Sequence, residues 1–154
     1  MSVSIPFTGG CACGAIRYEC SAAPVLVWKC HCRTCQQATG SGFNANVMVL
    51  TSALTFTKGE PTYYGVPGGS GHVLYRGFCS TCGSPVGGKS EAFPDFRGVC
   101  AASLDDPSGL MPVAEIWTAS AQPWDYLNPQ LPTYAHQPTP EEFQALVALY
   151  SSHR

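Results

Sequence analysis

The sequence of 154 residues contains little charge. Asp, Glu, Lys and Arg together make up 12% of it, about half of their usual share in a soluble domain. Its 8 basic and 10 acidic side chains give a formal net charge of −2, and the basic ones are scattered along the chain. Binding of nucleic acid needs Lys and Arg clustered on one face. We therefore expect no nucleic-acid partner.

Long hydrophobic runs are also missing. No stretch approaches the ~18 consecutive apolar residues of a membrane-spanning helix, so we expect no membrane partner. Residues 1–14 have neither a basic start nor a continuous apolar stretch, so the sequence predicts no secretory signal. The cytoplasm is the expected location, and thiols stay reduced there.

Signals for helices are scarce, whereas 16 glycines and 13 prolines favour turns and short strands. In the segment 15–20, Ile16, Tyr18 and Cys20 alternate with polar residues, which is typical of a half-buried strand. Further short segments bounded by Gly, Pro, Ser or Asp are expected to be strands: 25–28, 43–50, 54–57, 62–66, 72–78, 98–102 and 114–117.

Two helices are expected. The first covers 33–39 and is stopped by Gly40. The second lies at the C-terminus, where Thr139 and Glu142 form a capping box around Pro140 at the first helical position. Its apolar stripe should pack on a sheet as part of the core: Phe143, Leu146, Val147 and Tyr150. With no repeat, low-complexity run or linker, residues 1–154 are predicted to form a single, mainly β domain with short antiparallel strands and a C-terminal helix.

Nine cysteines are the most distinctive feature of the composition. In a reducing compartment, and with an odd count, they indicate metal ligands rather than disulfides. Seven of them fall into three clusters: Cys11 with Cys13; Cys30, Cys32 and Cys35; and Cys79 with Cys82. A Cys-x-x-Cys turn lets two thiolates converge on one ion, and a following glycine gives the backbone freedom to close it. Gly14 and Gly83 occupy these positions.

The number of ligands suggests two zinc sites. A structural zinc is closed by four protein ligands, whereas a catalytic zinc keeps one position open. The two pairs would make a closed site from Cys11, Cys13, Cys79 and Cys82. The triplet, Cys30, Cys32 and Cys35, would then form an open site. Spacing alone leaves alternatives: the triplet with one distant cysteine, a second structural zinc completed by a histidine, or a redox thiol group. Soft thiolates favour zinc, and no ferredoxin-type spacing is present.

The other cysteines and the histidines lack ligand-like spacing. Cys20 and Cys100 are expected to be small buried hydrophobic residues. If the segment is extended, His31 points away from its neighbours and is expected near the metal site or on the surface. His72, His136 and His153 are expected on the surface.

An open zinc site with three thiolates favours thiol chemistry. Three thiolates over-neutralise the ion and make it a poor activator of water, whereas a bound thiol is deprotonated outright. The expected reaction is addition of a thiolate to a small electrophile such as an aldehyde, or its reversal.

In order, the three clusters resemble the glutathione-dependent formaldehyde-activating (GFA) family, also named the centromere-protein-V (CENP-V) domain family. The resemblance covers 9–14, 30–43, 76–83, 104–107 and 116–124. It implies a β-tent-like arrangement of short sheets around zinc sites, a structural zinc on Cys11, Cys13, Cys79 and Cys82, and a labile zinc on Cys30, Cys32 and Cys35. It also implies a carbon–sulfur lyase activity that joins glutathione, as co-substrate, to formaldehyde and yields S-hydroxymethylglutathione.

One departure concerns the segment before Ile116. Family members often carry His there, whereas this chain has Glu115, so the identity of the substrate does not carry over. Lys29, Arg33 and Arg76 are the nearest candidates for holding carboxylates of a thiol such as glutathione, although a solvated or structural cation is the simpler interpretation of each. The alternatives to a lyase are a non-catalytic structural or interaction module and a redox or metal-buffering protein. Trp117 and Trp124 could line a pocket, but large aromatic residues more often belong to a core.

Overall fold

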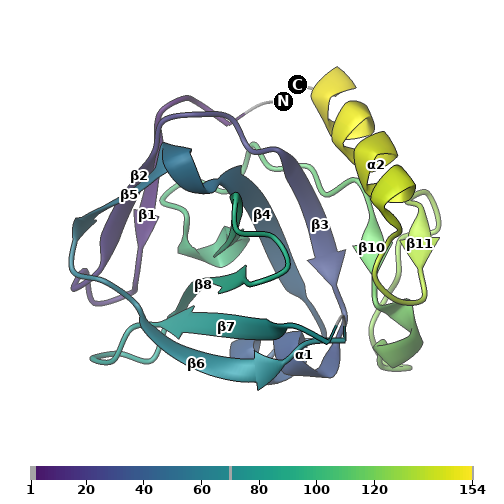
Figure 1. The fold of residues 1–154 in the computed structure, drawn as a ribbon, viewed down its shortest axis with the longest axis horizontal. Coiled ribbons are helices and arrows are strands. Elements are labelled where there is room, and N and C mark those ends of the chain that lie inside the picture. Colours follow the sequence, from purple (N-terminus) through teal and green to yellow (C-terminus); the bar gives the residue numbers. More distant parts are fainter. Residues whose placement is uncertain (1–2, 70, 154) are drawn as a thin grey trace.

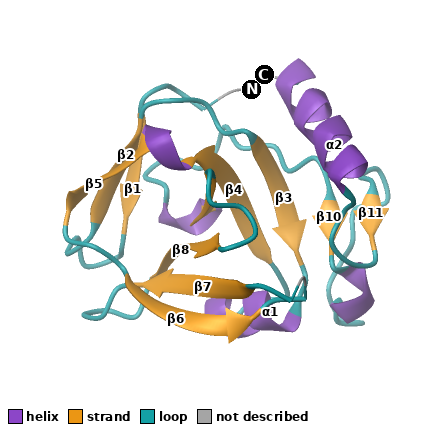
Figure 2. Cartoon of the chain, viewed as in Figure 1, coloured by secondary structure: helices purple, strands orange, loops and turns teal. Residues whose placement is uncertain are grey.

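The structure is a computed structural model that describes residues 3–69 and 71–153. Strands dominate it, and its longest helix lies at one edge (Figure 2). In chain order the elements are β1 (Phe7–Gly10), β2 (Arg17–Cys20), β3 (Leu26–Cys30), α1 (Arg33–Thr39), β4 (Asn44–Leu50), η1 (Thr51–Ala53), β5 (Leu54–Lys58), β6 (Thr62–Pro67), β7 (Val73–Phe78), β8 (Pro85–Ser90), β9 (Phe96–Cys100), η2 (Ala101–Ser103), β10 (Glu115–Ile116), η3 (Thr118–Ser120), β11 (Thr133–Tyr134) and α2 (Pro140–Ser152).

The strands form two sheets. The smaller has the order β1-β2-β5, and the larger has the order β11-β10-β3-β4-β9-β8-β7-β6. Neighbouring strands are antiparallel except at β10, which pairs in parallel with both β3 and β11. The prediction of a mainly β fold is confirmed. In Figure 1 the larger sheet bends, so that β6 and β7 run across the ends of β3 and β4.

The two faces of the larger sheet differ, because successive side chains of a strand point to opposite faces. On one face Val27, Val47 and Val99 are almost completely buried in the core. On the other face, alternate residues of four strands line a cavity: Trp28 and Cys30, Asn46 and Met48, Leu74 and Arg76, and Phe96 and Gly98. The fold thus separates a packed core from a hollow that Cys30 borders.

Three strands lie outside the predicted segments: β1, β8 and β11. β8 has the sequence Pro-Val-Gly-Gly-Lys-Ser, which lacks the apolar alternation that marks a strand. Its glycines are needed for close pairing, since a Cβ at Gly87 would lie 2.1 Å from the carbonyl oxygen of Gly98. The backbone contact that places β8 between β7 and β9 is not visible as a side-chain pattern.

Both predicted helices are confirmed. α1 ends at Gly40, which has φ 68°. In α2, Glu142 N donates to Thr139 Oγ1 and Thr139 N donates to the Glu142 carboxylate, so the capping box is complete. Leu146 and Tyr150 are buried, as the stripe predicted. Of the helices in 3–69 and 71–153, none is long and apolar enough to cross a membrane.

The capping box gives a first test. Glu142→Ala removes the carboxylate that accepts from Thr139 N, and we expect a loss of about 0.5–1 kcal/mol in the free energy of unfolding. Glu141→Ala is the matched control, because Glu141 lies in the same turn but is not a partner in the box. Urea denaturation measures both variants. Equal losses would contradict the role of the box.

Candidate functional site

A four-thiol cluster joins two turns that are distant in sequence. The first turn follows β1 and carries Cys11 and Cys13, and Gly14 N closes it by donating to Cys11 O at 3.1 Å. The second follows β7 and carries Cys79 and Cys82, and Gly83 N donates to Cys79 O at 2.8 Å. Gly14 and Gly83 both have φ 75°, a conformation that favours glycine. Both turns thus close through a glycine with positive φ directly after the second cysteine, although the second turn is one residue longer than the first.

The geometry of this cluster fits one metal ion. The four Sγ atoms, from Cys11, Cys13, Cys79 and Cys82, all lie within 4.8 Å of one another. Cys11 Sγ is 3.5 Å from Cys13 Sγ, and Cys13 Sγ is 3.8 Å from Cys79 Sγ. Two thiolates on a tetrahedral zinc, with Zn–S bonds of ~2.3 Å, lie about 3.8 Å apart, whereas disulfide sulfurs lie about 2.05 Å apart. The spacing is that of ligands, not of a disulfide.

The three-thiol cluster is formed where β3 leads into α1. Cys30 ends β3, Cys32 is the N-cap of α1, and Cys35 lies in its first turn. Their Sγ atoms also lie within 4.8 Å of one another, and no His, Asp, Glu or further Cys of residues 3–69 and 71–153 completes the group. The cluster could hold a metal ion with three protein ligands.

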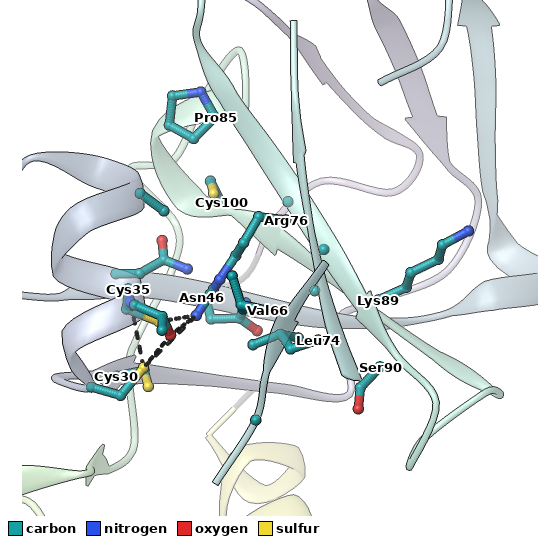
Figure 3. Close-up of a pocket in the computed structure, with 18 of the residues that line it drawn as sticks. Cys30, Cys35, Asn46, Val66, Leu74, Arg76, Pro85, Lys89, Ser90 and Cys100 are labelled. Atoms are coloured by element: carbon teal, nitrogen blue, oxygen red, sulfur yellow. Dashed lines mark hydrogen bonds between the residues drawn. The ribbon is translucent and has the colours of Figure 1, made fainter. Parts of the chain in front are cut away.

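Arg76 is the cation beside the three-thiol cluster. It projects from β7, and its Nη2 lies 3.3 Å from Cys35 Sγ and 3.8 Å from Cys32 Sγ, while donating to Thr34 Oγ1 at 2.7 Å. Figure 3 shows its side chain reaching toward the thiols across the pocket. Arg76 Nε is buried and has no hydrogen-bond partner among the described residues. A guanidinium so placed stabilises thiolates.

Hydrogen bonds favour the thiolate form of one cysteine in each cluster. Hydrogen bonds from the Cys30 and Cys35 thiols lower the pKa of Cys32. In the four-thiol cluster, the Ser84 hydroxyl and backbone amide lower the pKa of Cys82 to about 5. By contrast, burial raises the pKa of Cys100 to about 12. The thiolate, which is the ligand and the nucleophile, is thus favoured at Cys32 and Cys82, whereas hydrogen bonds to Cys32 and Cys35 raise the pKa of Cys30.

His31 lies in a buried network of charged groups, so the surface alternative for it was wrong. Its ring is completely buried. His31 Nε2 is 2.7 Å from Glu115 Oε2, and Nδ1 is 3.1 Å from Asp125 Oδ2, although the second contact lacks hydrogen-bond geometry. Glu115 Oε1 also accepts from Asn128 N at 2.7 Å and from Lys29 Nζ at 3.4 Å. The segment between Cys30 and Cys32 is thereby fixed to β10 and the loop after η3.

A cavity of about 750 Å³ opens beside the three-thiol cluster. All three thiol residues line it, together with residues of β4, β6, β7, β8, β9 and α2. Phe143 belongs to this lining, although the stripe of α2 predicted it as core, and it is only partly buried. Trp117 also lines the cavity, whereas Trp124 does not and is 74% exposed.

The other candidate residues have ordinary roles. Cys20 and Cys100 are buried, and His72, His136 and His153 are exposed, as expected. Lys29 pairs with Glu115. Arg33 is exposed and donates to Gln36, so it matches the simpler interpretation of a solvated cation.

The structure is thus that of a cysteine-rich, mainly β protein with two clusters that could each hold a metal ion. The chain belongs to the family described as glutathione-dependent formaldehyde-activating enzyme, whose model matches residues 6–120. In fold it is similar to the crystal structure of a protein from Rhodobacter sphaeroides. The matched region covers 82% of this chain and 98% of the Rhodobacter sphaeroides chain, with a TM-score of 0.51 and 21% sequence identity.

The buried network around His31 is testable by Glu115→Gln. The amide keeps one acceptor oxygen, places an NH2 donor against either His31 Nε2 or the Asn128 N–H, and removes the negative charge that faces Lys29. We expect a loss of about 1–3 kcal/mol in the free energy of unfolding, measured by urea denaturation. Glu141→Gln, at an exposed position, is the control and should change stability little. A Glu115→Gln protein as stable as the control would show that the network contributes nothing.

Proposed function

We propose that the protein is a zinc-dependent carbon–sulfur lyase that makes and breaks adducts between a small thiol and an aldehyde. Zinc on Cys11, Cys13, Cys79 and Cys82 would be structural, and zinc on Cys30, Cys32 and Cys35 would be the reactive ion. Glutathione and formaldehyde, named in the family description, are the first pair to test. Because the site needs reduced thiols, the cytoplasm is the proposed location.

One observation carries the proposal: three thiols, not four, face a cavity large enough for a substrate. Closed four-ligand sites are structural, whereas three protein ligands leave a position for a substrate. The four-thiol cluster has no such opening in its ligand set. A non-catalytic structural module is the alternative, and it would require the second ion to be closed as well.

The chemistry joins the sulfur of a thiol to the carbonyl carbon of an aldehyde. When bound, zinc would supply a free coordination position at which an incoming thiol is held as its thiolate. The carbon–sulfur bond forms as the carbonyl π bond breaks, and the proton lost by the thiol is balanced by one gained at the carbonyl oxygen. The reverse sequence cleaves the adduct.

Arg76 has two roles in this proposal. Its Nη2, near Cys32 and Cys35, offsets part of the negative charge of the thiolates. Its Nε–H has no acceptor among the described residues and is available to the oxygen that becomes negative during addition. A substrate that fills the cavity would displace water from it and so strengthen both interactions.

The test combines native mass spectrometry with NMR exchange measurements on the reduced, zinc-replete protein. We expect two zinc ions per chain, a glutathione adduct, and faster exchange between free formaldehyde and its glutathione adduct than in buffer alone. Cys32→Ser should stay folded, lose one zinc ion and lose the acceleration. Cys79→Ser should lose its fold, because binding of structural zinc is coupled to folding.

Cys20→Ala is the matched control, since Cys20 is buried but belongs to neither cluster. It should keep both zinc ions and the acceleration, with only a modest loss of stability. A wild-type protein that binds two zinc ions but no thiol, and does not accelerate exchange, would favour the structural module. Acceleration that survives in Cys32→Ser would place the chemistry elsewhere.

A further inference from the structure

The cavity is much larger than formaldehyde requires. Its volume of about 750 Å³ lies within the range of pockets that enclose drug-sized ligands, ~300–1,000 Å³. Most of this space lies beyond the few ångströms around the thiols in which a carbon–sulfur bond could form. Its lining must therefore recognise another part of the substrate.

An aromatic wall lines the cavity. We define it as Trp28, Phe93, Phe96 and Phe143, four residues from β3, the loop after β8, β9 and α2. The ring centroid of Phe143 lies 6.0 Å from that of Trp28, 6.4 Å from that of Phe93 and 6.2 Å from that of Phe96. Met48, Val66 and Leu74 add aliphatic surface. This surface is suited to an apolar group.

Acidic side chains are absent from the lining as far as the described residues show. An ammonium group in the cavity would therefore find no carboxylate, and burying an unpaired charge is costly. Glutathione carries an ammonium group on its γ-glutamyl end. The lining thus disfavours burial of that end of glutathione.

The other basic residues of the lining, Arg33, Lys89 and Arg97, have polar or aromatic partners of their own. Arg97 Nη1 donates to Tyr63 Oη at 2.9 Å, and Lys89 Nζ lies 4.5 Å from the centre of the Tyr63 ring. Tyr63 does not line the cavity, and Figure 3 shows Lys89 pointing away from the thiols. Arg33 is exposed. Among the basic side chains of residues 3–69 and 71–153, only Arg76 contacts the thiols of this cluster. Three thiolates, one zinc ion and one guanidinium sum to zero charge.

Trp117 adds a strained contact at the border of the cavity. It has φ 58°, which is unfavourable for a bulky aromatic residue. Its ring packs against Gly69, where a Cβ would lie 2.1 Å from Trp117 Cη2. Such strain persists where the surrounding structure fixes it, and it is concentrated at functional sites. The unfavourable backbone conformation of Trp117 therefore accompanies the position of its ring at the border of the cavity.

We propose that the substrate is a thiol–aldehyde adduct whose body is apolar, aromatic or branched aliphatic, carries no ammonium group and lies against the aromatic wall. This inference rests on the proposed function and names its substrate class. Either partner of the adduct could carry the apolar body: an apolar thiol combined with formaldehyde, or an apolar aldehyde combined with a small thiol. The reactive end lies at the three-thiol cluster in both cases.

The experiment uses the zinc-replete full chain and two readouts. Isothermal titration calorimetry measures binding of benzyl mercaptan, 2-mercaptoethanol and glutathione. NMR exchange then measures kcat/KM for four adducts, made by pairing benzyl mercaptan or 2-mercaptoethanol with formaldehyde or phenylacetaldehyde. We expect benzyl mercaptan to bind at least tenfold more tightly than glutathione. We also expect kcat/KM for one of the two adducts with a single phenyl group to be about tenfold higher than for the 2-mercaptoethanol–formaldehyde adduct. The preferred adduct then shows whether the thiol or the aldehyde carries the apolar body.

Two variants test the wall itself. Phe93→Ala removes a partly exposed ring and should lower kcat/KM for the preferred phenyl adduct several-fold, with a smaller effect on the adduct of 2-mercaptoethanol and formaldehyde. Trp117→Asn should act in the same direction and keep the fold, because Asn tolerates positive φ. Tyr126→Ala is the control: Tyr126 is 75% exposed and does not line the cavity, so both values should stay unchanged.

The outcomes separate this inference from the proposed function. Tighter binding of glutathione than of benzyl mercaptan, with acceleration of the glutathione–formaldehyde exchange, would overturn the apolar substrate and leave the lyase standing. Tight binding of benzyl mercaptan without acceleration of any adduct would contradict the lyase and support the apolar cavity. Equal losses for phenyl and small adducts in Phe93→Ala would also overturn the inference, because the wall would then act only through stability.

Discussion

The convergence of thiols from three separate segments is the constraint on which the rest of the structure depends. β7 is the element common to both clusters: it carries Arg76 beside the three-thiol cluster and leads into the turn of Cys79 and Cys82. The four-thiol cluster holds that turn against the turn after β1. If β7 moved, the cation beside the three thiols would move with it. An ion in the four-thiol cluster would thus help to hold Arg76 beside the three-thiol cluster.

The rest of the site follows from burial. The cysteine segment after β3 is fixed on one side by Arg76 and Thr34, and on the other by the contact between His31 and Glu115. Both sides use charged groups that are expensive to bury unless they are paired. Apart from Asn44, Asn46 and a few basic side chains, the cavity face of the larger sheet is largely apolar or glycine-rich, which leaves an open volume next to the thiols. The site therefore combines fixed charge at one end with an aromatic wall at the other.

Much of this could be predicted from the sequence. The spacing of the cysteines predicted the two local pairs and the triplet, but it left open which of them share a site, and the grouping seen in the structure was suggested by the ligand count and by the family resemblance. The capping box at Thr139 and Glu142 was equally clear, since it depends on local contacts. Most strands were found where apolar residues alternate. β8 was not, since its pairing depends on close backbone contact at Gly87, and glycine leaves no side-chain pattern.

The partners of individual side chains could not be predicted in the same way. Alternation indicated that His31 points away from its neighbours, but not that Glu115, 84 positions later, would meet it. Phe143 lies on an apolar stripe whose usual role is core packing, and the stripe does not reveal that one end borders a cavity. The pairing of Lys29 with Glu115 likewise depends on parallel pairing between β3 and β10. These features arise from contacts between distant segments, which a single sequence does not display.

The central claim is that the Cys30, Cys32 and Cys35 site holds zinc with one position open. Zinc X-ray absorption spectroscopy of the two-zinc protein tests it most directly. Seven sulfur ligands and one lighter ligand shared between two ions should give fewer than four sulfurs per zinc on average, rising to four when a thiol is added. The same rise should be absent in Cys32→Ser. Four sulfurs per zinc before any thiol is added would contradict the open site.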